Sequence, residues 1–197
     1  LKHKKVLVVG GGKSGIAAVG LLTKMGAESI LFDSKKGITA EELREKLPEG
    51  YKAVCYGETL PEDVEKEVEA VGLSPGVPIE SPFVQKFAER NIPISGAIEL
   101  GYQMEKGRLI AITGTNGKTT TTTLVGEIMK ACYEPVFVVG NIGNPYTAEA
   151  DKTTETSVTV AEISSFQLET ALTFRPHVSA ILNITPDHLN RHKTMEC

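Results

Sequence analysis

The sequence has few cysteines, no excess of positive charge and no long apolar run. Its three cysteines, Cys55, Cys132 and Cys197, are odd in number and far apart. This argues against a disulfide framework or a zinc module and favours a reducing, cytoplasmic setting. A net charge of −4 with interspersed signs gives no basic surface for nucleic acid. Because there is neither a signal peptide nor an apolar run that could span a bilayer, we expect a soluble protein that binds neither nucleic acid nor membrane.

The most informative feature present is an apolar strand that leads into a glycine turn with a lysine. Residues 110–120 read Ile-Ala-Ile-Thr-Gly-Thr-Asn-Gly-Lys-Thr-Thr, and a helix is expected directly after the turn. In such loops, backbone N–H groups and the helix start bind phosphates, a lysine adds charge, and a hydroxyl can ligate Mg²⁺. The general pattern has a glycine where this chain has Ile112, so the loop must turn at Gly114 instead. The predicted ATP-binding residues are Gly114, Thr115, Asn116, Gly117, Lys118, Thr119 and Thr120.

A second glycine turn lies near the start of the chain. The pattern Gly10-x-Gly12-x-x-Gly15 follows an apolar strand and opens a helix, and Asp33 ends the next strand. This is typical of dinucleotide-binding folds, in which the turn accommodates a diphosphate. Read alone, the pattern indicates NAD, but a UDP-sugar would satisfy the same turn, and glycines that serve only tight packing would also explain it.

Alternating strands and helices predict an α/β fold with parallel sheets in two units. The first unit contains expected strands at 6–9, 29–32, 68–73 and 92–94, and expected helices at 16–25, 39–47 and 81–90. Thr39 and Glu42 form a plausible capping box. The second unit contains expected strands at 108–113, 136–139, 158–163 and 178–184, and an expected helix at 119–131. We place the boundary near residue 95, which gives a Rossmann-like domain over 1–95 and a P-loop ATPase-like domain over 96–197.

Polar residues follow two strands at the sheet edge where parallel α/β folds place their sites. Glu162 ends the strand 158–163, within reach of a Mg²⁺ held by the phosphate loop. Thr185 and Pro186 predict the start of a helix that puts His188 and His192 on one face. Because no third metal ligand is near, we favour one functional histidine, His188, and expect His192 at the surface.

Four strings together resemble the Mur ligases of peptidoglycan synthesis, and among them those that add D-glutamate. These strings span residues 113–119, 140–143, 162–169 and 182–189, and the resemblance covers the whole chain. It implies that the first domain binds the UDP part of the substrate rather than NAD. The substrate-binding residues implied by the resemblance are Gly12, Lys13, Ser14, Asp33, Ser34, Lys35, Gly76, Asn141 and Ser164.

The resemblance also implies a reaction. ATP would phosphorylate the alanine carboxylate of UDP-N-acetylmuramoyl-L-alanine, and the amine of D-glutamate would attack the acyl phosphate. Lys118 and His188 would be the catalytic residues, Thr119 and Glu162 would hold one Mg²⁺, and His188 would help to hold a second. A monomer is expected.

The resemblance stops before the rest of the family's middle domain and before its C-terminal domain, so we expect a truncated ligase. Asn190 stands where the family usually has Asp, which puts the local metal geometry in question. Two alternatives stay open at this point. One is a fragment that binds nucleotide or UDP-sugar without catalysis, and the other is an NAD-binding oxidoreductase.

Overall fold

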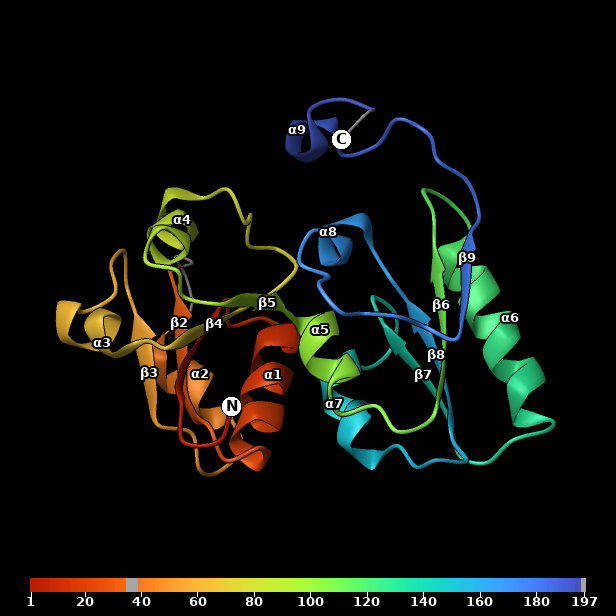
Figure 1. Cartoon of the computed structure of the whole chain (residues 1–197), viewed down its shortest axis with the longest axis horizontal. Coiled ribbons are helices and arrows are strands. Elements are labelled where there is room, and N and C mark those ends of the chain that lie inside the picture. The colour runs from red at the N-terminus through yellow and green to blue at the C-terminus, as the bar shows by residue number, and fades with distance from the viewer. Residues whose placement is uncertain (35–38, 196–197) are drawn as a thin grey trace.

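Two parallel sheets lie side by side in the protein (Figure 1). The structure is a computed structural model that describes residues 1–34 and 39–195. The first sheet has the order β3-β2-β1-β4-β5 and the second has the order β7-β8-β6-β9. The strands of the first sheet are β1 (Lys5–Val9), β2 (Glu28–Asp33), β3 (Ala53–Tyr56), β4 (Ala70–Leu73) and β5 (Ile94–Gly96). Those of the second are β6 (Arg108–Thr113), β7 (Val136–Gly140), β8 (Val158–Glu162) and β9 (Val178–Ile181). The predicted α/β class with parallel sheets is confirmed.

Helices cover both faces of the first sheet because its strands are apolar on both sides. Val6 and Val8 of β1 face a core shared with α1 and α2, whereas Leu7 and Val9 face a core shared with α4. This is the two-residue alternation of an extended chain. The helices of this half are α1 (Lys13–Lys24), α2 (Ala40–Glu45), α3 (Glu62–Glu67) and α4 (Pro82–Glu89). The helices cover the two faces of the sheet and leave the carboxyl ends of its strands uncovered.

The second sheet is covered in the same way. Its helical elements are α5 (Ala97–Tyr102), α6 (Lys118–Lys130), α7 (Tyr146–Glu149), η1 (Ala150–Lys152), α8 (Ser165–Leu168) and α9 (Leu189–His192). One core contains Ile98 of α5 and Tyr146 of α7, and the opposite core lies under α6. No helix within residues 1–34 and 39–195 is long and apolar enough to cross a membrane.

Helix α5 lies at the joint between the two sheets (Figure 1). Its Glu99 side chain is buried, with 1% of the residue exposed. The carboxylate accepts hydrogen bonds from the backbone N–H groups of Leu172, Thr173 and Phe174, at 3.0, 2.9 and 3.1 Å. It also accepts one from the Thr173 hydroxyl. Glu99 therefore fastens the chain between α8 and β9 to the joint.

The capping box at the start of α2 is confirmed, since Thr39 Oγ1 accepts from the Glu42 N–H and Glu42 accepts from the Thr39 N–H. Strand β3 and helix α3 were not predicted; both are short and lack a clear apolar period. The prediction that a helix starts at Thr185 is wrong. The helix begins at Leu189, after His188 at φ +51°, because the Thr185 backbone bonds with the Thr115 hydroxyl instead. The strand expected to reach residue 184 ends at Ile181.

Candidate functional site

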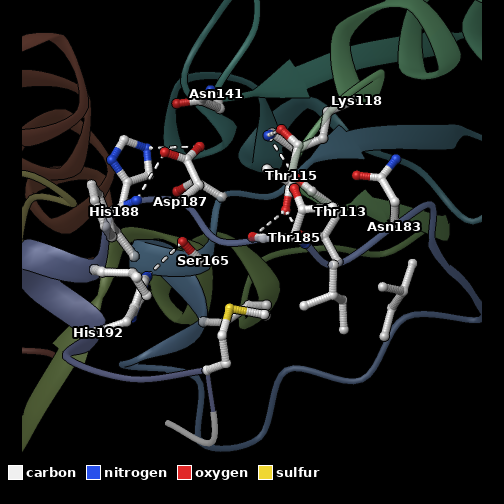
Figure 2. Close-up of a pocket in the computed structure, with 18 of the residues that line it drawn as sticks. Thr113, Thr115, Lys118, Asn141, Ser165, Asn183, Thr185, Asp187, His188 and His192 are labelled. Carbon is white, nitrogen blue, oxygen red and sulfur yellow. Dashed lines mark hydrogen bonds and ion pairs between the residues drawn. The ribbon is translucent and has the colours of Figure 1, made fainter.

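A cavity of about 570 Å³ opens where the carboxyl ends of strands from both sheets meet (Figure 2). Its wall includes Gly76 after β4, the phosphate-loop residues Gly114, Thr115 and Lys118, Asn141 after β7, Ser164 after β8, and His188. The fold thus brings together seven of the residues singled out from the sequence. They come from segments more than 100 residues apart. One ligand in this cavity could touch both halves of the chain.

The phosphate loop has the backbone that its glycines allow. Gly114 has φ +144° and Gly117, the N-cap of α6, has φ +83°, both in the region that favours glycine. The loop is held by Asn183, whose backbone C=O accepts from the Thr115 N–H at 3.0 Å. The Asn183 side chain accepts from the Asn116 N–H and donates to the Asn116 C=O, each at 2.9 Å. The N–H groups of Thr115 and Asn116 are therefore engaged, so a phosphate at this loop would have to be met by Gly117 and the first turn of α6.

Lys118 lies back over this loop. Its Nζ donates to the carbonyl oxygens of Gly114 and Thr115, at 2.7 and 2.9 Å (Figure 2). The ammonium is therefore held beside the cavity, next to the N-terminus of a 13-residue helix. A phosphate at this point would meet a positive side chain and the positive end of the helix dipole.

Glu162 lies behind the phosphate loop and is 1% exposed. One carboxylate oxygen accepts from Thr119 Oγ1 at 2.8 Å, and the other accepts from Asn141 Nδ2 at 2.9 Å. The carboxylate at the end of β8 and the hydroxyl at the start of α6 are thus already adjacent. Oxygen ligands of this kind, one or two from protein with the rest from phosphate and water, suit Mg²⁺.

The backbone beside Glu162 is tightly packed. Gly140, its partner across β7 and β8, has φ +108°, and a Cβ built there would lie 2.2 Å from the Glu162 carbonyl oxygen. The next residue, Asn141, donates its N–H to the same oxygen at 2.9 Å. Glycine at 140 therefore lets Asn141 reach the carboxylate.

His188 lies on the other side of the cavity from Lys118 in Figure 2. Its side chain is 55% exposed, and its Nε2 is 3.7 Å from Asp187 Oδ2. Its ring centroid is 4.8 Å from that of Phe166. Among residues 1–34 and 39–195, no group of three or more His, Cys, Asp and Glu side chains could hold a metal ion. These residues therefore do not by themselves form a second metal site at His188.

His192, which was expected at the surface, is partly exposed. Its side chain is 20% exposed, and its Nε2 lies 2.9 Å from Ser165 Oγ. Both histidines approach the ring of Phe166, which is 5.4 Å from that of His192. The predicted shared face is therefore present, since His188 is the N-cap of α9 and its carbonyl oxygen accepts from the His192 N–H at 3.1 Å.

The glycine turn of the first domain is closely packed. A Cβ on Gly15 would lie 1.8 Å from the Gly10 carbonyl oxygen. The first turn of α1 can therefore lie this close to the Gly10 backbone only with glycine at position 15. Asp33 accepts from the Gly11 N–H at 2.5 Å, which fixes the carboxylate next to the turn. Gly12 is the N-cap of α1, and Lys13 and Ser14 begin the helix. Ser34 directly follows Asp33 and is exposed, whereas Lys35 lies outside the described residues. Gly12, Lys13, Ser14 and Asp33 thus lie around the start of α1, whereas Gly76 lines the cavity described above.

Sequence reasoning missed three residues that shape the cavity: Asn183, Phe166 and Arg191. Each acts through a tertiary contact with a partner distant in sequence, or through a ring that only the fold brings near. Asn183 and Arg191 lie within or next to recognised strings, but their spacing says nothing about the partners they reach.

Comparisons with known proteins relate both halves of the chain to one family. Residues 4–96 match the family model described as "Mur ligase MurD-like, N-terminal domain", and residues 112–197 match "Mur ligase middle domain". A UDP-N-acetylmuramoylalanine–D-glutamate ligase of Lachnoclostridium phytofermentans is 59% identical over 98% of the chain. One of Lachnospira eligens is 57% identical over the whole chain. The chain spans only 42% and 44% of the length of these two relatives.

Solved structures show the same fold. A UDP-N-acetylmuramate:L-alanyl-γ-D-glutamyl-meso-diaminopimelate ligase of Neisseria meningitides superposes with a TM-score of 0.59 at 13% identity, covering 96% of this chain and 63% of that one. A UDP-N-acetylmuramate–alanine ligase of Thermotoga maritima superposes with a TM-score of 0.56 at 24% identity, covering 97% of this chain and 44% of that one.

Proposed function

Because the chain belongs to the Mur ligase family, we propose that it carries the substrate- and ATP-binding parts of an ADP-forming ligase of peptidoglycan synthesis. The ligase would add D-glutamate to UDP-N-acetylmuramoyl-L-alanine, the reaction named in the relatives that are 57–59% identical. The setting would be the cytoplasm, and the protein would act as a monomer.

One observation carries the proposal: the phosphate loop and the first-domain residue Gly76 line the same cavity. A nucleotide triphosphate on the loop and a UDP-linked substrate reaching past Gly76 would therefore meet there. An NAD-binding oxidoreductase does not need the second nucleotide loop, and this arrangement argues against that alternative.

The chain's own residues would serve phosphoryl transfer as follows. The N–H groups of Gly117 and the first turn of α6 would bind phosphate oxygens, and Lys118 would leave the loop carbonyls to neutralise their charge. Thr119 and Glu162 would hold Mg²⁺, since their oxygens already lie 2.8 Å apart. When bound, the metal would supply further neutralisation of charge on the transferred group.

The alanine carboxylate would attack the terminal phosphorus of ATP, with ADP leaving and an acyl phosphate forming. Asn141, Ser164 and His188 line the cavity and would orient this end of the substrate. The amine of D-glutamate would then attack the acyl carbon, a proton would be lost from nitrogen, and inorganic phosphate would leave.

ADP release by this chain tests the proposal, with UDP-N-acetylmuramoyl-L-alanine, ATP, Mg²⁺ and D-glutamate present and each omitted in turn. Binding of ATP and of the UDP-substrate is measured on the same preparation by calorimetry. Glutamate-dependent release would mean that the residues of this chain suffice for turnover. Binding of both ligands without release would support a binding fragment of such a ligase, and failure to bind the UDP-substrate would refute the proposal.

A further inference from the structure

Arg191 joins segments that lie far apart in the sequence. It belongs to the short helix α9, which lies above the joint between the two sheets (Figure 1). Its guanidinium donates to the carbonyl oxygens of Pro75 and Val77, at 3.1 and 3.3 Å, on both sides of Gly76. It also donates from two nitrogens to the Glu169 carboxylate, with a closest distance of 2.6 Å. One side chain therefore ties the first domain to the chain that follows α8.

The surroundings of Arg191 favour a fixed position. Its side chain is 14% exposed and that of Glu169 is 20% exposed, so water screens the pair only in part. The guanidinium also lies over the ring of Phe166, 4.3 Å from its centroid. A flat group with donors in several directions can satisfy these acceptors and stack on the ring at once, which an ammonium cannot do.

Arg191 is also fixed relative to the residues of the cavity. The backbone N–H of Arg191 donates to the His188 carbonyl oxygen at 2.8 Å. His188 and Phe166 both line the cavity, and so does Gly76 between the two carbonyl oxygens that Arg191 binds. Arg191 thus has contacts to the first-domain wall and to the opposite wall, without lining the cavity itself.

We propose that Arg191 is a positioning residue that sets the separation between the two ends of the substrate site. It holds the loop 75–77, where the UDP end would bind, close to Phe166 and His188, where the muramoyl-alanine end would bind. This inference rests on the proposed function, since it assigns those two ends to one ligand. Arg191 would contribute much less to the binding of UDP alone, because UDP reaches only one wall and does not depend on the separation between the two.

Calorimetric titration with two ligands, UDP and UDP-N-acetylmuramoyl-L-alanine, separates this role from a general effect on folding. The variants are Arg191→Met, which removes the charge, and Arg191→Lys, which keeps the charge but loses the planar fork. Lys193→Met is the matched control, because Lys193 pairs with Glu80 at 2.7 Å near the same loop but with both side chains more than 60% exposed. Thermal melts confirm that each variant is folded.

We expect both Arg191 variants to bind the whole substrate about tenfold more weakly, or worse, and UDP within about twofold of the unmodified chain. The control is expected to change either affinity by no more than about twofold. Glu169→Gln should also weaken binding of the whole substrate. Combining it with Arg191→Met should weaken that binding little further, because both changes break the same Arg191–Glu169 pair. Equal losses for UDP and for the whole substrate, or full rescue by lysine, would overturn the proposal.

A measurement without ligand keeps this inference separate from the proposed function. If the unmodified chain bound no UDP-substrate, the proposed function would fail, and hydrogen exchange would decide whether Arg191 fixes the two walls. Arg191→Met should then speed amide exchange in residues 74–81 and 185–195, whereas Lys193→Met should not. Unchanged exchange in both segments would refute the positioning role.

Discussion

Replacing Glu99 by glutamine should destabilise the joint between the two sheets, although the side chain keeps its shape. The carboxylate accepts four hydrogen bonds, two on each oxygen, from three consecutive backbone N–H groups and from the Thr173 hydroxyl. Glutamine has one acceptor oxygen and one donor nitrogen, so in either orientation at least one of these backbone N–H groups faces another donor. The variant therefore tests whether this charge organises the joint.

The magnitude follows from the burial of the group. Leaving one donor beside this buried carboxylate unsatisfied costs about 1–3 kcal/mol, and the remaining bonds lose the strengthening that an ionised acceptor gives. We expect the free energy of unfolding to fall by roughly 2 to 4 kcal/mol. For a chain of this size that corresponds to a drop in Tm of roughly 5 to 15 °C.

The difference should also depend on pH. Burial raises the pKa of the Glu99 carboxyl, but the hydrogen bonds from the Thr173 hydroxyl and from the three backbone N–H groups outweigh burial and hold the pKa below its ordinary value. A depressed pKa in the folded state gives stability that is complete well above the unfolded pKa, about 4.3, and is lost as the pH falls through the folded pKa. The advantage of glutamate over glutamine should therefore shrink below about pH 4.3.

Urea denaturation followed by circular dichroism, repeated from neutral to acidic pH, measures both effects. Glu127→Gln is the control, since Glu127 forms an exposed pair with Lys130 on α6 and should change stability by less than about 0.5 kcal/mol. A Glu99→Gln variant as stable as the control at neutral pH would refute the reasoning. A loss that stayed constant down to the acid limit would show that shape, and not charge, matters.

Three further predictions concern the phosphate loop, and calorimetry checks each. Lys118→Met should weaken ATP binding by roughly 10- to 150-fold, because one charge-assisted contact is lost, and leave UDP binding unchanged. Asn183→Ala should weaken ATP binding about fivefold, because the two hydrogen bonds that hold the Asn116 backbone disappear; an unchanged affinity would mean that the loop keeps its shape without them. Glu162→Gln should reduce the Mg²⁺-dependent gain in ATP affinity by about tenfold or more, and a full gain would rule out the carboxylate as the metal ligand.

Local signals predicted the elements whose cause is local. The strand, glycine turn and helix around Gly114 and around Gly12 were found because glycine conformations and apolar periods are written in consecutive residues. The same holds for the Thr39 capping box. The likeness of the strings then supplied the substrate and metal roles, which remain proposals.

Tertiary competition explains what could not be predicted. Thr185 followed by Pro186 has the pattern of a helix start, but the Thr185 backbone bonds with Thr115, 70 residues away in sequence. The helix therefore starts three residues later, with His188 instead of Thr185 as its N-cap, and His188 takes a left-handed conformation that no local rule assigns to it. The hydrogen-bond partners of the Arg191 side chain lie 22 to 116 residues away, so no short window of sequence could have indicated them.

Because Gly140 lies so close to the Glu162 backbone, we expect substitutions at these two positions to be coupled during evolution. A side chain at 140 would push β7 away from β8 and carry Asn141 out of reach of the carboxylate, so the loss would fall on residue 162 and not on residue 140. Relatives that still need the carboxylate are therefore expected to keep glycine at position 140. Residues other than glycine are expected at position 140 only in relatives that have lost the acidic residue at position 162.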